Sequence, residues 1–256
     1  MVSEIFGTFL LVFVGCGAIA LTLVYEVFEH LWQIALCWGG IVSISILLLH
    51  RWGPVHLNPA VSCYFWLQGQ INKKHFLALI GGQMIGAAIA TWVLYQSIAI
   101  DLALFESAQQ IDRSSLEGIQ SAMIFTEFYP NPGGNLEQVS TFEAFVAEMI
   151  GTFFLLLVIT LLSKTHFQIW VKALLIGLTL SLLIFTLASY TQAGFNPVRD
   201  LIPRIILPFL GWTSAAWSAG IAGSLLVYVA GPLSASTLLW IIMNSVEKRK
   251  GTSSHG

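Results

Sequence analysis

The chain has 256 residues, of which 56% are hydrophobic and 9% are charged, and its formal net charge is −2. Soluble domains carry roughly 25% charged residues, so this composition excludes an ordinary soluble protein and predicts a chain that crosses a membrane several times. The near-neutral charge gives no reason to expect a nucleic-acid partner. Cys16, Cys37 and Cys63 lack the spacing of a disulfide framework or a metal site, so we expect no metal and no cofactor.

Six apolar segments are each long enough to cross a bilayer, which takes about 20 residues. We place them at about residues 2–24, 31–50, 75–98, 142–163, 168–189 and 222–245. Two further segments begin at similar triplets, Asn58-Pro59-Ala60 and Asn196-Pro197-Val198. Because Asn is a favoured helix N-cap and Pro is tolerated at the first helical position, each triplet predicts the start of a helix.

The helix that starts at Asn58 ends near Gln68, so it reaches only about half of a ~30 Å hydrocarbon core. Two such half-helices that meet tip to tip would complete one span. Non-helical backbone at membrane depth is tolerated only where protein buries it or water lines it. We therefore expect the starts of the two half-helices to border a pore or cavity.

The two halves of the chain are related to each other. Glu4-Ile5-Phe6-Gly7-Thr8-Phe9 recurs as Glu148-Met149-Ile150-Gly151-Thr152-Phe153. Each half holds three spans and one half-helix, and an odd number of spans makes the second copy enter the membrane from the opposite side. We predict one transmembrane channel domain over residues 1–256, with an inverted repeat at about 1–98 and 142–245, an extracellular loop at 99–141 and a tail at 246–256.

The basic residues indicate the orientation. Eight of them fall on one face of this topology: Arg51, Lys73, Lys74, Lys164, Lys172, Lys248, Arg249 and Lys250. The positive-inside rule then predicts that both termini are cytoplasmic, in a plasma membrane, or in the inner membrane if the source is bacterial. The loop 99–141 is rich in acidic residues and turn signals, which fits either a cover over the outer vestibule or a disordered extracellular loop.

The two half-helix tips carry the predicted chemistry. Each tip has unsatisfied backbone N–H groups and roughly half a positive charge, so a cation at their junction is repelled. We expect the side-chain oxygens of Asn58 and Asn196 to cap backbone donors, which leaves both NH₂ groups as donors to a solute oxygen. This arrangement favours neutral permeants that carry oxygen.

The segments from His56 to Ser62 and from Gly194 to Asp200 resemble the two signature boxes of the major intrinsic proteins, the aquaporins and aquaglyceroporins. The resemblance extends over essentially the whole chain. It implies an all-α membrane protein with six tilted transmembrane helices plus two re-entrant half-helices, one pore per subunit, and a homotetramer in the lipid bilayer.

The resemblance also places a selectivity filter at Trp38, Ile184, Ala193 and Arg199. Arg199 would donate to solute oxygens and repel cations, although pairing with an acid such as Asp200 is an alternative. Trp38 matches glycerol-conducting members and offers an apolar face to a polyol. Ile184 stands where water-selective members usually have a histidine.

Asp200 is expected to give structural support. His56 lies near a cytoplasmic end, where it either bonds to local backbone or lines the inner mouth of the pore. Matching glutamates in the family hold the half-helices in place, which implies that role for Glu4 and Glu148.

The chain departs from typical glycerol facilitators at Val198, which replaces Ala, and at Ala193, where those channels often have an aromatic residue. Its filter is similar to those of nodulin-like plant channels, a group associated with glycerol, water and neutral metalloid hydroxides. We therefore predict a passive channel for small neutral solutes, glycerol or similar polyols together with water. A water-selective channel and a channel for arsenous or boric acid are alternatives.

A secondary transporter with inverted repeats, coupled to protons through Glu4 or Glu148, is the rival hypothesis. An enzyme is not expected, because the apolar segments hold no His/Cys/Asp cluster, no Gly-x-Ser-x-Gly and no His-Glu-x-x-His.

Overall fold

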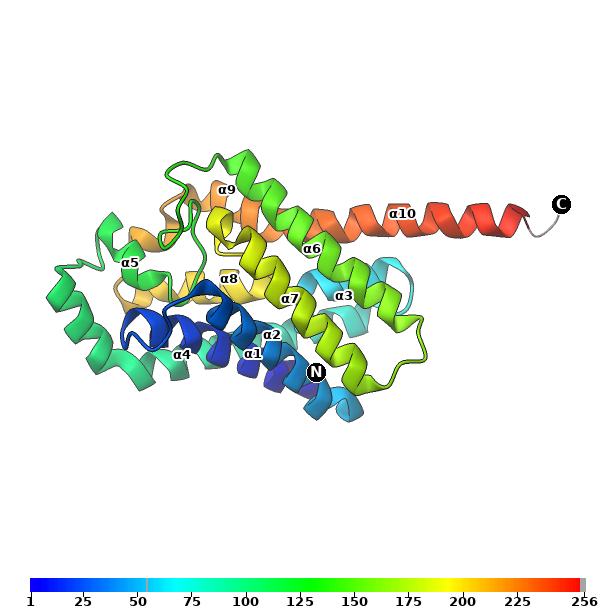
Figure 1. The fold of residues 1–256 in the computed structure, drawn as a ribbon, viewed down its shortest axis with the longest axis horizontal. Coiled ribbons are helices and arrows are strands. Elements are labelled where there is room, and N and C mark those ends of the chain that lie inside the picture. The colour runs from blue at the N-terminus through cyan, green and yellow to red at the C-terminus, as the bar shows by residue number, and fades with distance from the viewer. Residues whose placement is uncertain (54, 254–256) are drawn as a thin grey trace.

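The computed structural model describes residues 1–53 and 55–253, with side chains described as far as residue 248. This part of the chain is helical and contains no strand (Figure 1). Its α-helices are α1 (Val2–Leu23), α2 (Leu31–Leu49), α3 (Pro59–Leu67), α4 (Lys73–Gln109), α5 (Ile119–Ala122), α6 (Thr141–Ser163), α7 (Ile169–Thr191), α8 (Pro197–Ile206), α9 (Gly220–Leu225) and α10 (Gly231–Ser253). Short 3-10 turns cover His50–Trp52, Leu116–Gly118, Leu207–Leu210 and Ala215–Trp217, and a π-helical turn covers Leu226–Ala230.

Within the described residues, 6 helical segments are long and apolar enough to cross a membrane. They are α1, α2 with the turn after it, α4, α6, α7 and the continuous run from α9 to α10. The six predicted spans are therefore confirmed, and the chain is a multi-pass membrane protein.

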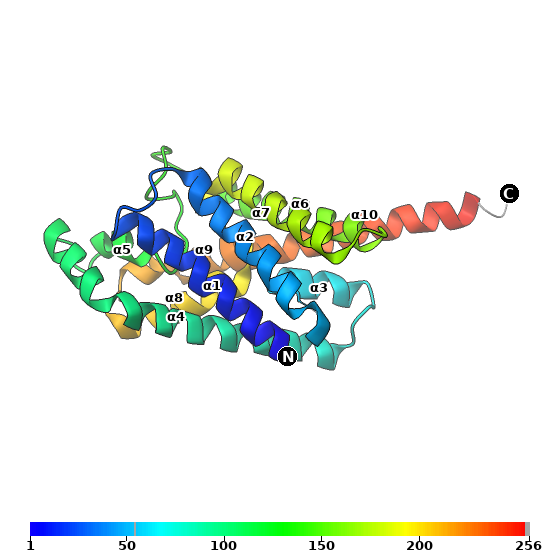
Figure 2. The same ribbon diagram turned by 60° about the horizontal axis from the view of Figure 1, so that its bottom comes forward.

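The two half-helices are short, as predicted. α3 has 9 residues and α8 has 10, so each is about 14 Å long. Figures 1 and 2 show them end to end in the middle of the bundle, with the long helices around them. Together they span about one hydrocarbon thickness.

α2 and α7 cross so closely that only glycine fits at the crossing. A Cβ added at Gly39 would lie 2.2 Å from the carbonyl oxygen of Gly177, and a Cβ at Gly177 would lie 2.3 Å from that of Gly39. Ser43 and Ser181 each donate a hydrogen bond to a backbone carbonyl of the opposite helix, both at 2.9 Å. These reciprocal contacts relate the two halves of the chain by a local twofold pattern, as the predicted inverted repeat requires.

α4 is longer than the span predicted for it at 75–98. It continues to Gln109 and protrudes from the bundle beside α5. Residues 99–109 contain no Gly or Pro and include three alanines and two leucines, which are good helix formers. Their acidic residues suggested a loop, but Glu106 is buried and accepts a hydrogen bond from Arg113 Nε at 2.6 Å.

The rest of the predicted loop 99–141 is partly inside the protein. Residues 121–128 are all buried, and Trp212 donates to Ser121 Oγ at 2.9 Å. The alternative of a disordered loop therefore fails for this segment, because its apolar residues pack against the bundle.

The two ends of the chain lie on the same side of the bundle. α1 begins, and α10 ends, toward the end of the molecule that holds the α6–α7 connection (Figures 1 and 2). α10 extends past the other helices toward the C-terminus. Of the tail predicted at 246–256, residues 254–256 and the side chains of 249–253, including those of Arg249 and Lys250, lie outside the described residues.

Candidate functional site

The two Asn-Pro triplets meet at the joint between α3 and α8. Asn58 Oδ1 accepts from the backbone N–H of Ala60 at 2.9 Å, and Asn196 Oδ1 accepts from that of Val198 at 3.2 Å. Both predicted caps are thus present. Pro59 and Pro197 occupy the first turn of each helix, where a missing N–H costs nothing.

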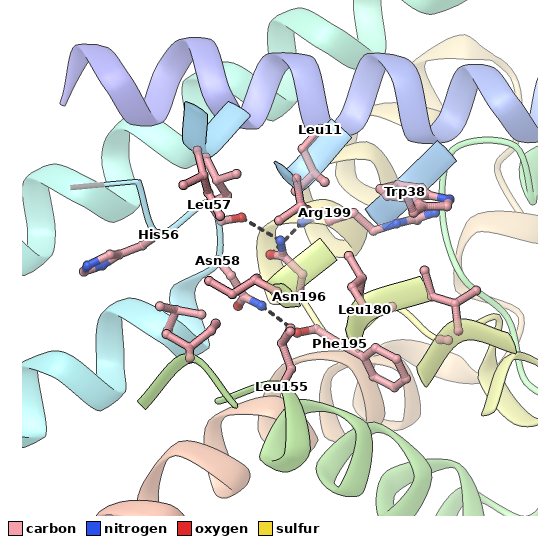
Figure 3. A pocket seen from close by; sticks show the side chains of 18 of the residues that line it. Leu11, Trp38, His56, Leu57, Asn58, Leu155, Leu180, Phe195, Asn196 and Arg199 are labelled. Atoms are coloured by element: carbon pink, nitrogen blue, oxygen red, sulfur yellow. Dashed lines mark hydrogen bonds between the residues drawn. The ribbon is translucent and has the colours of Figure 1, made fainter. Parts of the chain in front are cut away.

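The side-chain amides also join the two halves of the chain. Asn58 Nδ2 donates to the carbonyl oxygen of Phe195, and Asn196 Nδ2 donates to that of Leu57, both at 2.7 Å (Figure 3). These bonds across the joint were not among the expectations from the sequence, which gave the NH₂ groups only to the solute. An amide has two donor hydrogens, so each asparagine keeps one for a permeant and uses the other to hold the opposite half-helix.

Two buried glutamates hold the backbone that leads into the half-helices. Glu4 accepts from the N–H groups of His56 and Leu57 at 2.5 and 2.8 Å. Glu148 accepts from the N–H groups of Gly194 and Phe195 at 3.0 and 2.6 Å. Gln83 adds a 2.7 Å bond to Glu4, and Thr191 adds one to Glu148, also at 2.7 Å. These carboxylates satisfy backbone donors that would otherwise be buried without a partner.

The residues just before the triplets adopt left-handed backbone conformations. The φ angles are 57° at Leu57 and 49° at Phe195, a region that costs a residue with a side chain about 1–3 kcal/mol. Gly7 and Gly151 make room for these side chains: a Cβ at Gly151 would lie 2.1 Å from the Phe195 ring. The repeated Glu-x-x-Gly-Thr pattern thus supplies both the bonds and the space that the half-helix starts require.

The four predicted filter residues line one cavity. Trp38, Ile184, Ala193 and Arg199 all belong to its wall, and its volume is about 260 Å³. Asn58, Asn196 and His56 line the same cavity, which extends from the filter past the joint of the half-helices. His56 accepts or donates a 3.0 Å bond with Ser62 Oγ and stacks on Phe65 with ring centroids 5.0 Å apart.

The cavity lining combines apolar side chains with residues that have unbonded backbone acceptors. The apolar side chains include Leu11, Val42, Leu155, Leu180 and Ile184. The carbonyl oxygens of His56, Ala193 and Gly194 accept no hydrogen bond from any residue that the structure describes, while the N–H groups of the same segments are bound by the glutamates or by Thr191. These carbonyls are free to accept from a solute.

Arg199 is held by an acid that the sequence analysis placed in the outer loop. Its guanidinium lies 2.6 Å from Glu127 Oε1 and 4.5 Å from the centre of the Trp38 ring, and Nη1 donates to the carbonyl of Phe125 at 3.4 Å. The alternative that Arg199 pairs with an acid is therefore confirmed, but the acid is Glu127 and not Asp200. Asp200 instead accepts from Arg204 at 2.7 Å.

Asp200 also anchors the loop segment that carries Glu127. Its Oδ1 accepts from Thr126 Oγ1 at 2.6 Å and from the N–H of Glu127 at 2.8 Å. Sequence reasoning missed Glu127, because a contact across the two halves of the chain leaves no local pattern. The available signal was an acid inside the apolar run from Ala122 to Phe128, where a surface loop should be polar.

An inverted repeat of membrane-spanning helices, with a cavity that crosses the joint of two half-helices, is typical of proteins that move solutes across a membrane. The family described as Major intrinsic protein matches residues 1–241. The chain belongs to this family, which confirms the resemblance in its sequence.

Named relatives share most of the chain. The glycerol uptake facilitator protein of Pseudomonas aeruginosa is 33% identical over 224 residues, which cover 85% of this chain and 77% of the relative. The protein of the same name from Escherichia coli K12 is 32% identical over 225 residues, 86% and 77% of the two chains. The propanediol uptake facilitator of Salmonella typhimurium is 31% identical over 224 residues, 85% and 81% of the two chains.

A solved structure supports the fold. The X-ray structure of the aquaglyceroporin from Plasmodium falciparum matches with a TM-score of 0.76 and 24% identity, covering 93% of this chain and 91% of that one. The predicted aquaporin-like fold of six spans and two half-helices is confirmed.

Proposed function

We propose that the protein is a passive channel for small neutral polyols, with glycerol as the principal solute and water as a second one. The observation that carries this proposal is the mixed lining of the cavity, which combines apolar side chains with residues whose backbone carbonyls are unbonded and with Asn58, Asn196 and Arg199. A polyol has a CH edge and a hydroxyl edge. The CH edge can contact the apolar side chains while the hydroxyl edge forms hydrogen bonds with the polar groups. The names of the bacterial relatives, which are glycerol and propanediol uptake facilitators, agree with this solute class.

The joint of the half-helices accounts for the preference for neutral solutes. Two helix N-termini point at each other there, and each carries roughly half a positive charge. A cation at this point meets repulsion from both helix ends. A hydroxyl oxygen instead accepts from the remaining amide hydrogens of Asn58 and Asn196.

Neither Glu4 nor Glu148 fits the rival role of a proton relay. Both oxygens of each carboxylate accept hydrogen bonds from the backbone or from neighbouring side chains. These hydrogen bonds are strongest when the carboxylate is ionised. Protonating the carboxylate during proton transport would therefore weaken the bonds that hold the half-helix in place. We assign both residues, together with Asp200, to structural support.

The filter roles of Trp38, Ile184, Ala193 and Arg199, and that of His56 at the inner mouth, are part of the proposal. Their shared cavity supports it. Ile184 and Ala193 add no hydrogen-bonding side chain to the filter, and Ala193 is small. This part of the filter is therefore apolar, which favours an amphipathic solute over strict water selectivity. Boric and arsenous acid are neutral hydroxides of similar size and are the second candidate solutes.

We further propose that both termini are cytoplasmic, in the plasma membrane or a bacterial inner membrane, and that the protein forms a homotetramer, as is typical of its family. The shared side of the two chain ends supports the first point. So does the position of Arg51, Lys73, Lys164 and Lys172 at helix ends on that side.

Proteoliposomes loaded with buffer test the channel against a carrier. We expect radiolabelled glycerol to equilibrate across the membrane and to stop at equal concentrations, with or without a pH gradient. Accumulation of glycerol above its outside concentration when a pH gradient is imposed would refute the proposal. Stopped-flow swelling with water, glycerol, urea and boric acid then ranks the solutes, and passage of water without glycerol would favour the water-selective alternative.

A further inference from the structure

Glu127 lies at the constriction as a buried acid beside the filter arginine. The side chains of Glu127 and Arg199 are 1% and 3% exposed, and 2.6 Å separates Oε1 from the guanidinium. Glu127 is part of the cavity wall. The family resemblance placed four residues in the filter, and Glu127 is not one of them.

Only one of the two carboxylate oxygens is satisfied. Oε2 of Glu127 is buried and has no hydrogen-bond partner among the described residues. A buried acceptor without a donor costs about 1–3 kcal/mol, and more when it is charged. A residue in a cavity wall can recover this free energy from the hydrogen of a hydroxyl or amide that enters the cavity.

The position of Glu127 is fixed from two sides. The carboxylate of Asp200 binds its backbone N–H at 2.8 Å, and the carbonyl of Glu127 accepts from Arg204. On the other side its Cγ packs against the backbone just before Phe195: a Cβ added at Gly194 would lie 3.1 Å away. The acid is therefore held against the second half-helix and the backbone that leads into it.

We propose that Glu127 is a fifth specificity-determining residue of the constriction, which cancels the charge of Arg199 and accepts a hydrogen bond from the permeating solute. The inference rests on the proposed channel function and refines its solute class. A constriction with a guanidinium and a carboxylate side by side suits solutes whose donors and acceptors are adjacent, such as polyols and urea. It also has no net charge to attract an anion.

Glu127→Gln separates this role from packing, because the two side chains have nearly the same shape. Its amide oxygen can still face Arg199, and its NH₂ group then stands where Oε2 was. The constriction loses an acceptor, gains a donor, and keeps an uncompensated guanidinium. We expect the permeabilities to glycerol and urea to fall about tenfold, a factor that corresponds to about 1.4 kcal/mol. The permeability to water should fall less. We also expect nitrate to enter proteoliposomes faster than it enters protein-free vesicles.

The control is Glu117→Gln, an exposed acid of the same loop, which should behave as wild type in every assay. Glu127→Asp is the second variant: it keeps the charge but retracts the carboxylate, so nitrate should stay excluded while the glycerol-to-water ratio changes. Size-exclusion profiles and thermal transitions establish that the variants fold.

The proposal is overturned if folded Glu127→Gln keeps the wild-type ratios of glycerol, urea and water and excludes nitrate. It is also overturned if Glu127→Asp and Glu127→Gln admit nitrate equally. If wild type conducts water but not glycerol, the proposed function fails on its own, while the nitrate measurement still decides the role of Glu127.

Discussion

Trp38 and Arg199 hold each other in place at the constriction. The guanidinium carbon lies 4.5 Å from the centre of the Trp38 ring, and the ring has room because residue 15 is glycine: a Cβ there would lie 2.3 Å from the indole. The ring thus forms one apolar wall of the filter and fixes the donor that faces it.

Replacing Trp38 by alanine should remove that wall and widen the filter. We expect the ratio of glycerol to water permeability to fall about fivefold, because a cation–π contact of about 1 kcal/mol and the apolar face for the CH edge are both lost. Stopped-flow light scattering measures both permeabilities. Trp32→Ala is the matched control, since Trp32 lies on the same helix but is half exposed; an equal change in both variants would contradict the assignment.

The site residues that could be predicted from the sequence are those that belong to local sequence patterns. The caps Asn58 and Asn196 follow from Asn-Pro spacing, and the anchors Glu4 and Glu148 follow from the family pattern that the two copies share. Glu127 could not be predicted, because its partner Arg199 lies far along the chain and meets it only after residues 121–128 fold into the bundle. The second use of each asparagine amide was missed for the same reason.

The helix pair α2 and α7 sets the spacing of the two halves. The contact at Gly39 and Gly177 brings backbone against backbone, which no side-chain movement can relieve. The fold depends on this crossing because Trp38 and Ile184 project from these two helices into the cavity.

Gly39→Ala should therefore destabilise the protein, while Gly40→Ala should not. A Cβ at Gly40 meets nothing within 4 Å, and alanine favours a helix over glycine by about 1 kcal/mol. Overpacking at Gly39 should cost about 1–3 kcal/mol or more. Thermal unfolding followed by tryptophan fluorescence in detergent compares the two variants; a transition of Gly39→Ala at or above that of Gly40→Ala would refute the close crossing.

Sequence reasoning located every spanning element, because hydropathy over about 20 residues is a strong signal. It misjudged the end of α4, where acidic residues suggested a loop but a buried Glu106 and good helix formers extend the helix. Helix ends beyond the apolar core depend on such tertiary contacts, which hydropathy does not report.

The whole molecule has two distinct ends. Lys74 and Ser107 stand near opposite ends of α4 and are both exposed; they are about 50 Å apart along the helix axis. Under the proposed orientation, Lys74 faces the cytoplasm and Ser107 the outside.

Single cysteines at these two positions test the orientation in intact cells, in a background where Cys16, Cys37 and Cys63 are serine. A membrane-impermeant maleimide should label Ser107→Cys from outside, and label Lys74→Cys only after the cells are opened. Labelling in the opposite order would reverse the predicted topology while leaving the fold unchanged.

In the proposed function, glycerol crosses the membrane passively through the joint of α3 and α8. Glycerol-driven reswelling of proteoliposomes that contain the wild-type protein, followed by stopped-flow light scattering over a range of temperatures, measures this passage. We predict reswelling much faster than in protein-free vesicles, with a low activation energy and no effect of a proton ionophore. Reswelling at the rate of protein-free vesicles, or with their steep temperature dependence, would show that the protein is not a glycerol channel.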